Sequence, residues 1–215
     1  MLLAGNQAYR KHVTGAGSMN YIYNAIQHLK TINHHKKLVM QGCFRLGLYR
    51  QGLLHDLSKY TWPELRIGIR YFRDDQSPHN GEREKYGYST AWLHHKGRNK
   101  HHAEYWIDYT ADTDPQGRHV AGMKMPVQYV VEMFVDRISA SKNYRKEKYQ
   151  DTDPLEYYEK RKHYMVVHDA TRKQLEILLH MLARDGEEKT FRYIRRHILR
   201  NQHLENFLHI FRKRS

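Results

Sequence analysis

Apolar residues recur at intervals of three and four along most of this chain, which is the spacing of one face of a helix. Ile22 and Ile26 follow it in residues 20–33, and a second apolar run, broken by glycines, extends over residues 38–54. These two stretches predict a pair of packed helices, and Pro126 opens another strong helical pattern. No stretch shows a convincing alternation of apolar and polar residues, the pattern of a strand. The sequence therefore predicts an all-α fold, a bundle with additional C-terminal helices.

Two helix starts are indicated by capping residues. Thr61 and Glu64 have the spacing of a capping box, in which each side chain bonds the backbone N–H of the other residue. Ser89 is suited to cap a short helix that carries His94 and His95. The polar segment 74–87 between these helices is predicted to be a loop.

The chain is strongly basic, with 37 Lys and Arg against 23 Asp and Glu and a formal charge of +14. Such a surface attracts phosphate-bearing partners, either small molecules or nucleic acid. Part of the excess lies near the C-terminus, where a basic face for nucleic acid and an ordinary solvated helix face are equally good interpretations. The residues concerned are Arg192, Arg195, Arg196, Arg200, Arg212, Lys213 and Arg214.

Membrane and secretory segments are not expected. No stretch approaches the roughly 18 apolar residues of a membrane span, and the N-terminus lacks the pattern of a secretory signal. The single cysteine, Cys43, cannot form an internal disulfide and lies among apolar helix formers, so core packing is its expected role. We expect a cytoplasmic protein in which residues 1–18 are a flexible leader.

Residues 52–59 read Gly-Leu-Leu-His-Asp-Leu-Ser-Lys, and they contain the most informative motif of the chain. Neighbouring residues of a regular helix do not share a face, but at a kinked or terminal turn His55 and Asp56 can reach one divalent ion. Lys59 then lies where a phosphate bound to that ion meets a positive charge. The motif predicts a metal site with a phosphate contact.

The 17 histidines are clustered along the chain, and Asp136 lies on a later helix. An isolated histidine is more often a surface or capping residue than a ligand, so the argument rests on their joint occurrence. Nitrogen and carboxylate ligands without cysteine suit Mn, Fe, Co, Ni or Zn and leave positions open for water. Together with His55 and Asp56 the histidines offer enough ligands for two ions, with Lys96 and Arg98 as further phosphate contacts. The clustered histidines are His34, His35, His94, His95, His101 and His102.

Two acidic residues are candidates to assist this site. Glu104 follows His102 closely and is expected to orient a ligand histidine through its other ring nitrogen. Glu132 precedes Asp136 by four residues, so it lies on the same helix face. It can accept such a hydrogen bond or act as a general base, although a helix-stabilising ion pair is the more common role.

The order of these residues resembles that of the HD-domain superfamily. Its ligands, a histidine, a His-Asp pair and a distant aspartate, correspond to His35, His55, Asp56 and Asp136, and its His-Asp-Ile-Gly-Lys variant matches residues 55–59 with two substitutions. The resemblance implies a helical, metal-dependent phosphohydrolase. The helix of Asp136 is also similar to a segment of the HD-GYP phosphodiesterases, but their Gly-Tyr-Pro signature is missing, so a cyclic dinucleotide substrate is not implied.

The additional histidines resemble those of binuclear HD enzymes, which include phosphodiesterases, nucleases and di-iron oxygenases. His95 and His102 are slightly favoured as ligands, with His94 and His101 as alternatives, and His34 is the alternative to the first histidine. Residues 91–106 are also similar to an uncharacterised bacterial and phage family of unknown function. That similarity extends over about residues 34–145 and implies no substrate.

These interpretations divide the chain into the leader, a metal-binding catalytic core over residues 19–150 and a helical extension with a basic tail over residues 151–215. The leading hypothesis is a hydrolase of phosphate monoesters or diesters, whose substrate is a nucleotide, nucleic acid or other phosphate ester. A di-iron oxygenase is the alternative enzyme. A non-catalytic nucleic-acid-binding protein is the alternative from another class.

Overall fold

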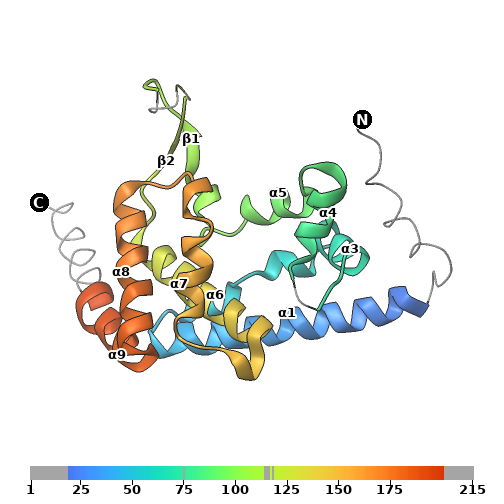
Figure 1. The fold of residues 1–215 in the computed structure, drawn as a ribbon, viewed down its shortest axis with the longest axis horizontal. Coiled ribbons are helices and arrows are strands. Elements are labelled where there is room, and N and C mark those ends of the chain that lie inside the picture. The colour runs from blue at the N-terminus through green and yellow to red at the C-terminus, as the bar shows by residue number, and fades with distance from the viewer. Residues whose placement is uncertain (1–18, 75, 114–116, 118, 201–215) are drawn as a thin grey trace, which may run out of the picture.

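The computed structural model describes residues 19–74, 76–113, 117 and 119–200 (Figure 1). The expected leader and the end of the basic tail lie outside the described residues. The described chain is mostly helical, which confirms the all-α prediction. Its helices and strands are α1 (Met19–Arg45), α2 (Tyr49–Leu54), α3 (Trp62–Arg70), α4 (Pro78–Tyr86), α5 (Thr90–Lys96), β1 (Ile107–Tyr109), β2 (Val120–Gly122), α6 (Val127–Arg145), α7 (Asp153–Glu159), α8 (Asp169–Asp185) and α9 (Glu187–Tyr193).

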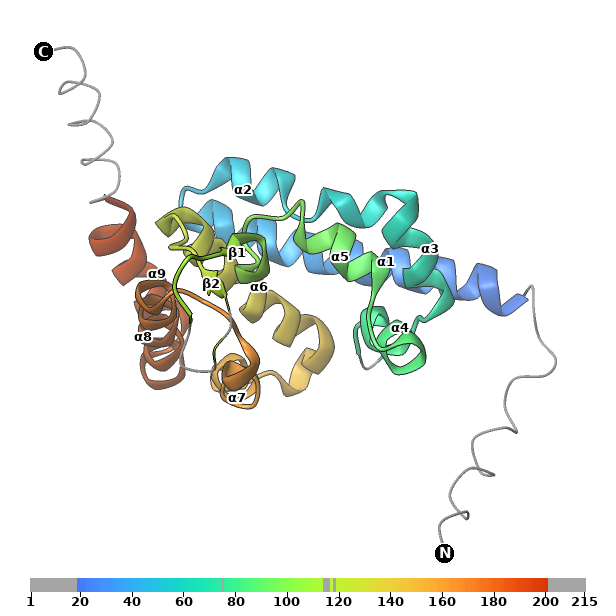
Figure 2. The same ribbon diagram turned by 90° about the horizontal axis from the view of Figure 1, so that it is seen from above.

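The long helix α1 organises the molecule, because α2, α3 and α6 all pack against it. The views in Figures 1 and 2 place α3, α4 and α5 beside one half of α1 and α6 to α9 beside the other. The predicted pair of helices over residues 20–33 and 38–54 is wrong in its boundary. The chain turns at Gly47, whose φ of +79° favours glycine, so His34 and His35 lie inside α1.

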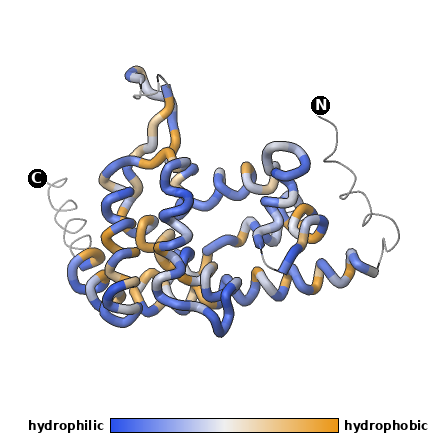
Figure 3. Tube along the Cα trace, in the orientation of Figure 1, coloured by the Kyte–Doolittle hydropathy of each residue, from blue (hydrophilic) through white to orange (hydrophobic). Residues whose placement is uncertain are grey.

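The hydrophobic core joins the second half of α1 to α6, α8 and α9. It includes Val39 and Cys43 from α1, Phe134 from α6, Leu178 from α8 and Phe191 from α9. Hydrophobic and hydrophilic stretches alternate along these helices, as expected for helices with one buried face (Figure 3). Helices on both sides of residue 150 therefore contribute to one core.

The predicted loop over residues 74–87 is wrong, because most of it forms helix α4. Pro78 occupies the start of this helix, and Gly81 packs so closely on Tyr71 that an added Cβ would lie 3.1 Å from that side chain. Glu82 is buried, but its carboxylate accepts hydrogen bonds from Ser89 and Thr90 at 2.6 and 2.7 Å. The polar composition of the segment thus reflects paired side chains in a tertiary contact.

One predicted cap is present and the other is absent. Ser89 Oγ accepts a hydrogen bond from the backbone N–H of Trp92 and caps α5, as predicted. Thr61 makes no side-chain cap at α3 and instead donates to the backbone oxygen of Ser58 at 2.6 Å. The capping box is absent because Glu64 is buried, with its carboxylate on the side chains of His94 and His95.

A short antiparallel hairpin, β1 with β2, was not predicted. Each strand has three residues, too few for the alternation that identifies a strand in a sequence. Gly122 in β2 approaches the backbone of residues 167–168 so closely that an added Cβ would lie 2.7 Å from it. Among the described helices, none combines the length and the apolar character needed to cross a membrane.

Candidate metal centre

The His-Asp pair lies at a break between two helical segments. Helix α2 ends at Leu54, Asp56 has φ 54° and ψ 26° in the left-handed region, and a short 3-10 helix begins at Leu57. Lys36 Nζ holds this turn by donating to the backbone oxygens of Leu53 and His55 at 2.8 and 2.9 Å. A positive φ is unusual for a residue other than glycine, and it turns both side chains of the pair toward one centre.

The first ligand group consists of His35 on α1, His55, Asp56 and Asp136 on α6. His35 Nε2 lies 3.0 Å from Asp136 Oδ1 and 3.9 Å from Asp56 Oδ2. His55 Nε2 lies 3.3 Å from Asp56 Oδ2 and 3.4 Å from Asp136 Oδ1. Two imidazoles and two carboxylates therefore converge where α1 packs on α6, a ligand set that suits a divalent transition metal.

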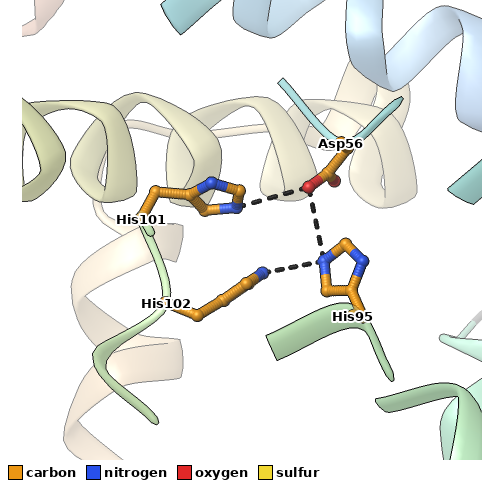
Figure 4. Close-up of side chains that lie close together, drawn as sticks. All are labelled: Asp56, His95, His101 and His102. Carbon is orange, nitrogen blue, oxygen red and sulfur yellow. Dashed lines mark hydrogen bonds and ion pairs between the residues drawn. The ribbon is translucent and has the colours of Figure 1, made fainter. Parts of the chain in front are cut away.

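The second ligand group consists of Asp56, His95, His101 and His102 (Figure 4). His95 Nε2 lies 2.9 Å from His102 Nε2, and Asp56 Oδ1 lies 3.3 Å from His95 Nε2 and 3.4 Å from His101 Nε2. His95 comes from the end of α5, and the other two histidines follow in the next turn. Asp56 directs Oδ2 to the first group and Oδ1 to the second, so one carboxylate serves both.

Two buried glutamates orient the ligand histidines. Glu132 Oε1 lies 3.0 Å from His55 Nδ1 and 3.2 Å from His101 Nδ1, and Glu64 Oε2 lies 2.8 Å from His95 Nδ1. A carboxylate accepts hydrogen bonds, so these contacts place the ring proton on Nδ1 and leave the Nε2 lone pair for a metal. Glu132 also forms a third close group with His55 and His101, which these hydrogen bonds explain.

Several buried atoms at the centre have no hydrogen-bond partner among the described residues. They are His35 Nε2, His55 Nε2, Asp56 Oδ1 and His101 Nε2, four of the six such side-chain atoms found in the described chain. A buried polar group without a partner costs about 1–3 kcal/mol. Each of these atoms belongs to a ligand group and faces other ligand atoms, so the donor set fits bound metal ions.

Burial and neighbouring charges shift the pKa values of several groups at the centre. Burial raises the pKa of Asp56, but His55 and Lys59 outweigh it and hold that pKa well below its ordinary value. Burial likewise raises the pKa of Asp136, while hydrogen bonds from the histidines hold it well below normal. Burial lowers the pKa of His35 and His102, which keeps both rings neutral. Burial lowers the pKa of His55, but the surrounding carboxylates outweigh it and raise that pKa well above its ordinary value. Ionised carboxylates and neutral imidazoles are the forms that coordinate a metal, so an ion bound at this centre would displace a proton from His55.

The three predicted phosphate contacts and Glu104, predicted to orient a ligand histidine, differ in their position relative to the centre. Lys59 Nζ lies 2.6 Å from Asp56 Oδ2 and borders the cavity over the centre. Lys96 and Arg98 are not among the residues that line this cavity, and exposed Arg98 donates to the backbone oxygen of His94 at 3.2 Å. Glu104 is half-buried and has no hydrogen bond to a ligand histidine among the described residues.

The histidines for which alternatives were left open differ in their position relative to the two groups. His95, His101 and His102 all enter the second group, whereas His94 lies outside both groups and hydrogen-bonds Glu64 Oε1 at 2.6 Å. His34 also lies outside, with Nδ1 donating to Asn143 Oδ1 at 2.7 Å. The structure thus brings together seven of the eight predicted metal ligands.

A cavity of about 210 Å³ gives access to the centre. Its lining includes ligand residues of both groups, together with Lys59 from the motif and aromatic side chains from several elements. His79 on α4 and Trp92 on α5 form part of the wall, with their ring centroids 5.5 Å apart. The cavity volume suits a small ligand or the end of a larger one.

Residues 24–181 match the model of a family of unknown function, DUF5662. The chain belongs to this family. The matched range contains every residue of both ligand groups. Comparisons with curated proteins and with solved structures find no match. The expected membership of an uncharacterised family is confirmed, and the resemblance to the HD superfamily stays a prediction.

The sequence did not predict several features of the candidate metal centre in this DUF5662 protein. It assigned Glu64 to a helix cap, and it did not foresee that one oxygen of Asp56 faces each group. His79 was placed in a loop. Glu64 precedes His95 by 31 residues, so no local pattern connects the two, and only the packing of α3 on α5 brings them together.

Proposed function

We propose that this protein is a metal-dependent phosphohydrolase that acts on a phosphate ester at a two-metal centre. The observation that carries the proposal is the division of the Asp56 carboxylate between two ligand groups, beside buried nitrogens that lack a partner. His35, His55, Asp56 and Asp136 would hold one ion, and the second group would hold the other. The donor set without cysteine favours Mn, Fe, Co, Ni or Zn.

The bound ions would supply a metal-activated water as nucleophile and would neutralise charge on the phosphoryl oxygens. In hydrolysis the water oxygen bonds to phosphorus, the ester P–O bond breaks, and the leaving oxygen takes up a proton. Lys59, beside Asp56 at the cavity, is placed to bind a phosphate oxygen. Glu64 and Glu132 keep the ligand rings oriented.

A di-iron oxygenase is the second candidate. It is favoured by the second ligand group, in which three imidazoles meet a single carboxylate, a set that iron accepts readily. This candidate predicts iron and oxygen consumption. The phosphohydrolase predicts release of alcohol or phosphate without oxygen uptake.

Metal analysis of Asp56→Asn tests the proposal most directly. We expect about two ions per chain in the purified protein and almost none in the variant, because Asp56 belongs to both groups. Hydrolysis of p-nitrophenyl phosphate or bis-p-nitrophenyl phosphate should fall to background. His94→Gln is the matched control, since His94 lies beside a ligand but outside both groups, and it should keep both ions.

The Lys59→Gln variant separates catalysis from metal binding. It should keep both ions but turn over a phosphate ester roughly 100-fold more slowly, because the substrate loses a charged contact. A wild-type protein that takes up no metal even on reconstitution would contradict the proposal. Two irons with oxygen uptake would favour the second candidate.

A further inference from the structure

A second concave site lies at the other end of α1 from the α3–α5 cluster. This cavity of about 530 Å³ is formed by α9, by the π-helix that continues it (Ile194–Leu199) and by the end of α1. Its lining is dominated by arginine and comprises Arg45, Glu188, Phe191, Arg192, Arg195, Arg196 and Arg200. None of these residues belongs to either metal-ligand group.

One arginine of the cavity is neutralised and held in place. Arg45 pairs with Glu187 and Glu188, and its guanidinium lies 4.5 Å from the centre of the Phe191 ring. Lys142 pairs with Glu187 as well. Both glutamates at the start of α9 therefore already have a basic partner.

The remaining arginines carry charge that the described residues do not balance. Arg192, Arg195, Arg196 and Arg200 are exposed, and none has a carboxylate partner within the described part of the chain. Four guanidinium groups around one concave surface repel each other unless an anion lies between them. Arginine binds phosphate through two parallel hydrogen bonds, so phosphate is the anion that this surface suits.

The π-helix explains why these side chains gather on one side. Ile194 and Leu199 are both buried, and they are five residues apart, the hydrogen-bonding interval of a π-helix. The wider turn keeps both apolar side chains in the core and leaves Arg195, Arg196 and Arg200 on the solvent side. From Arg192 to Arg200 the surface extends over about 12 Å at the helical rise per residue.

We propose that these four arginines bind the phosphate backbone of a nucleic-acid strand. A basic surface about 12 Å long spans more than one phosphate of a strand, whereas a single phosphate would engage only part of it. A membrane surface fits less well, because it requires apolar side chains next to the basic ones. Among the described residues that line the cavity, the apolar side chain is that of Phe191, and it is buried.

The test measures binding of a fluorescein-labelled 20-nucleotide oligothymidine by anisotropy over a range of salt concentrations. With four phosphate contacts, a plot of the logarithm of the binding constant against the logarithm of the salt concentration should have a slope of about −2.8. In Arg192→Gln/Arg196→Gln the slope should be about −1.4, with roughly tenfold weaker binding at low salt. The second double variant, Arg195→Gln/Arg200→Gln, should show the same change in slope and affinity as the first.

The control variant is Arg66→Gln/Arg70→Gln, which removes two exposed arginines at the same spacing from α3 and changes the net charge equally. It should keep the wild-type slope. Equal losses in the two kinds of variant would overturn the proposal, since binding would then follow overall charge. Displacement of the strand by inorganic tripolyphosphate at the same phosphate concentration, or equal retention on phosphatidylserine vesicles, would also overturn it.

This inference does not rest on the proposed phosphohydrolase activity. Asp56→Asn protein should bind the oligonucleotide as the wild type does, because the arginine cavity contains no metal ligand. Failure of catalysis would therefore leave the binding test intact. Loss of strand binding with both ions retained would leave the metal centre intact.

Discussion

The two ligand groups share Asp56 but are built on different supports. The first takes His35 and Asp136 from α1 and α6, the two longest helices, which pack against each other. The second takes His95 from the last turn of the seven-residue helix α5, and His101 and His102 from the turn that follows it. Long packed helices hold side chains more rigidly than a short helix end does.

The groups also differ in charge. The first contains two carboxylates and the second only the shared one. The carboxylates of the first group would balance the charge of a divalent ion, whereas the second group offers mainly imidazoles. If the centre binds two ions as proposed, we expect the first group to hold its ion more tightly and the second to exchange its ion more readily.

The largest expected difference between the two groups is in metal content, after one histidine is replaced in either the first or the second group. His35→Gln should remove the tightly held ion, and His102→Gln should remove the one that a chelator extracts first, so each variant keeps about one ion per chain. Stepwise extraction with EDTA, followed by elemental analysis, measures this. His34→Gln, adjacent on α1 and hydrogen-bonded to Asn143, should keep both ions. Simultaneous release of two ions from the wild type would show that the groups are equivalent.

Substitution of the glutamates that orient the ligand histidines should reduce metal affinity less than loss of a ligand, and the two glutamates should differ in which group they affect. Glu132 contacts ring nitrogens of both groups, through His55 and His101, whereas Glu64 contacts a ligand of the second group only. Glu132→Gln should therefore lower the affinity of both groups for metal by roughly 10- to 100-fold, whereas Glu64→Gln should lower that of the second group only. Competition with a chromogenic chelator reports each affinity. If Glu64→Gln lowered the metal affinity of both groups equally, the division into two groups would be wrong.

The sequence predicted the features that depend on local patterns, but not those that depend on contacts between helices. The all-α fold follows from apolar spacing, and His55 with Asp56 is a local motif. The distinction between His94 and His95 is not local, because it depends on the direction of each side chain at the end of α5. Glu64 and α4 were misjudged for a related reason. Their polar side chains are satisfied by partners on other helices, and propensity says nothing of such partners.

The smallest predicted effect concerns the pH dependence of stability, to which one buried histidine beside each group contributes. His28 lies two turns before His35 on α1, and the ring of His79 lies 6.1 Å from that of His95. Burial is the largest cause that lowers the pKa of His28 to about 4 and that of His79 to about 3. Neither is a metal ligand in either group.

These shifts predict that the metal-free protein loses stability as the pH falls from about 6.5 toward 4. In that range the unfolded chain takes up protons that folded His28 and His79 refuse, so the free energy of unfolding decreases by up to about 1.4 kcal/mol per pH unit for each residue. Above pH 6.5 neither contributes. In His28→Gln the decrease should be shallower by about 1 kcal/mol per pH unit. Urea unfolding in EDTA at pH 7, 6 and 5 measures it, with exposed His180→Gln as the control. Parallel pH profiles for wild type and His28→Gln would mean that His28 has the same pKa in the folded and unfolded protein, and that the cavity wall beside the first group is open to solvent.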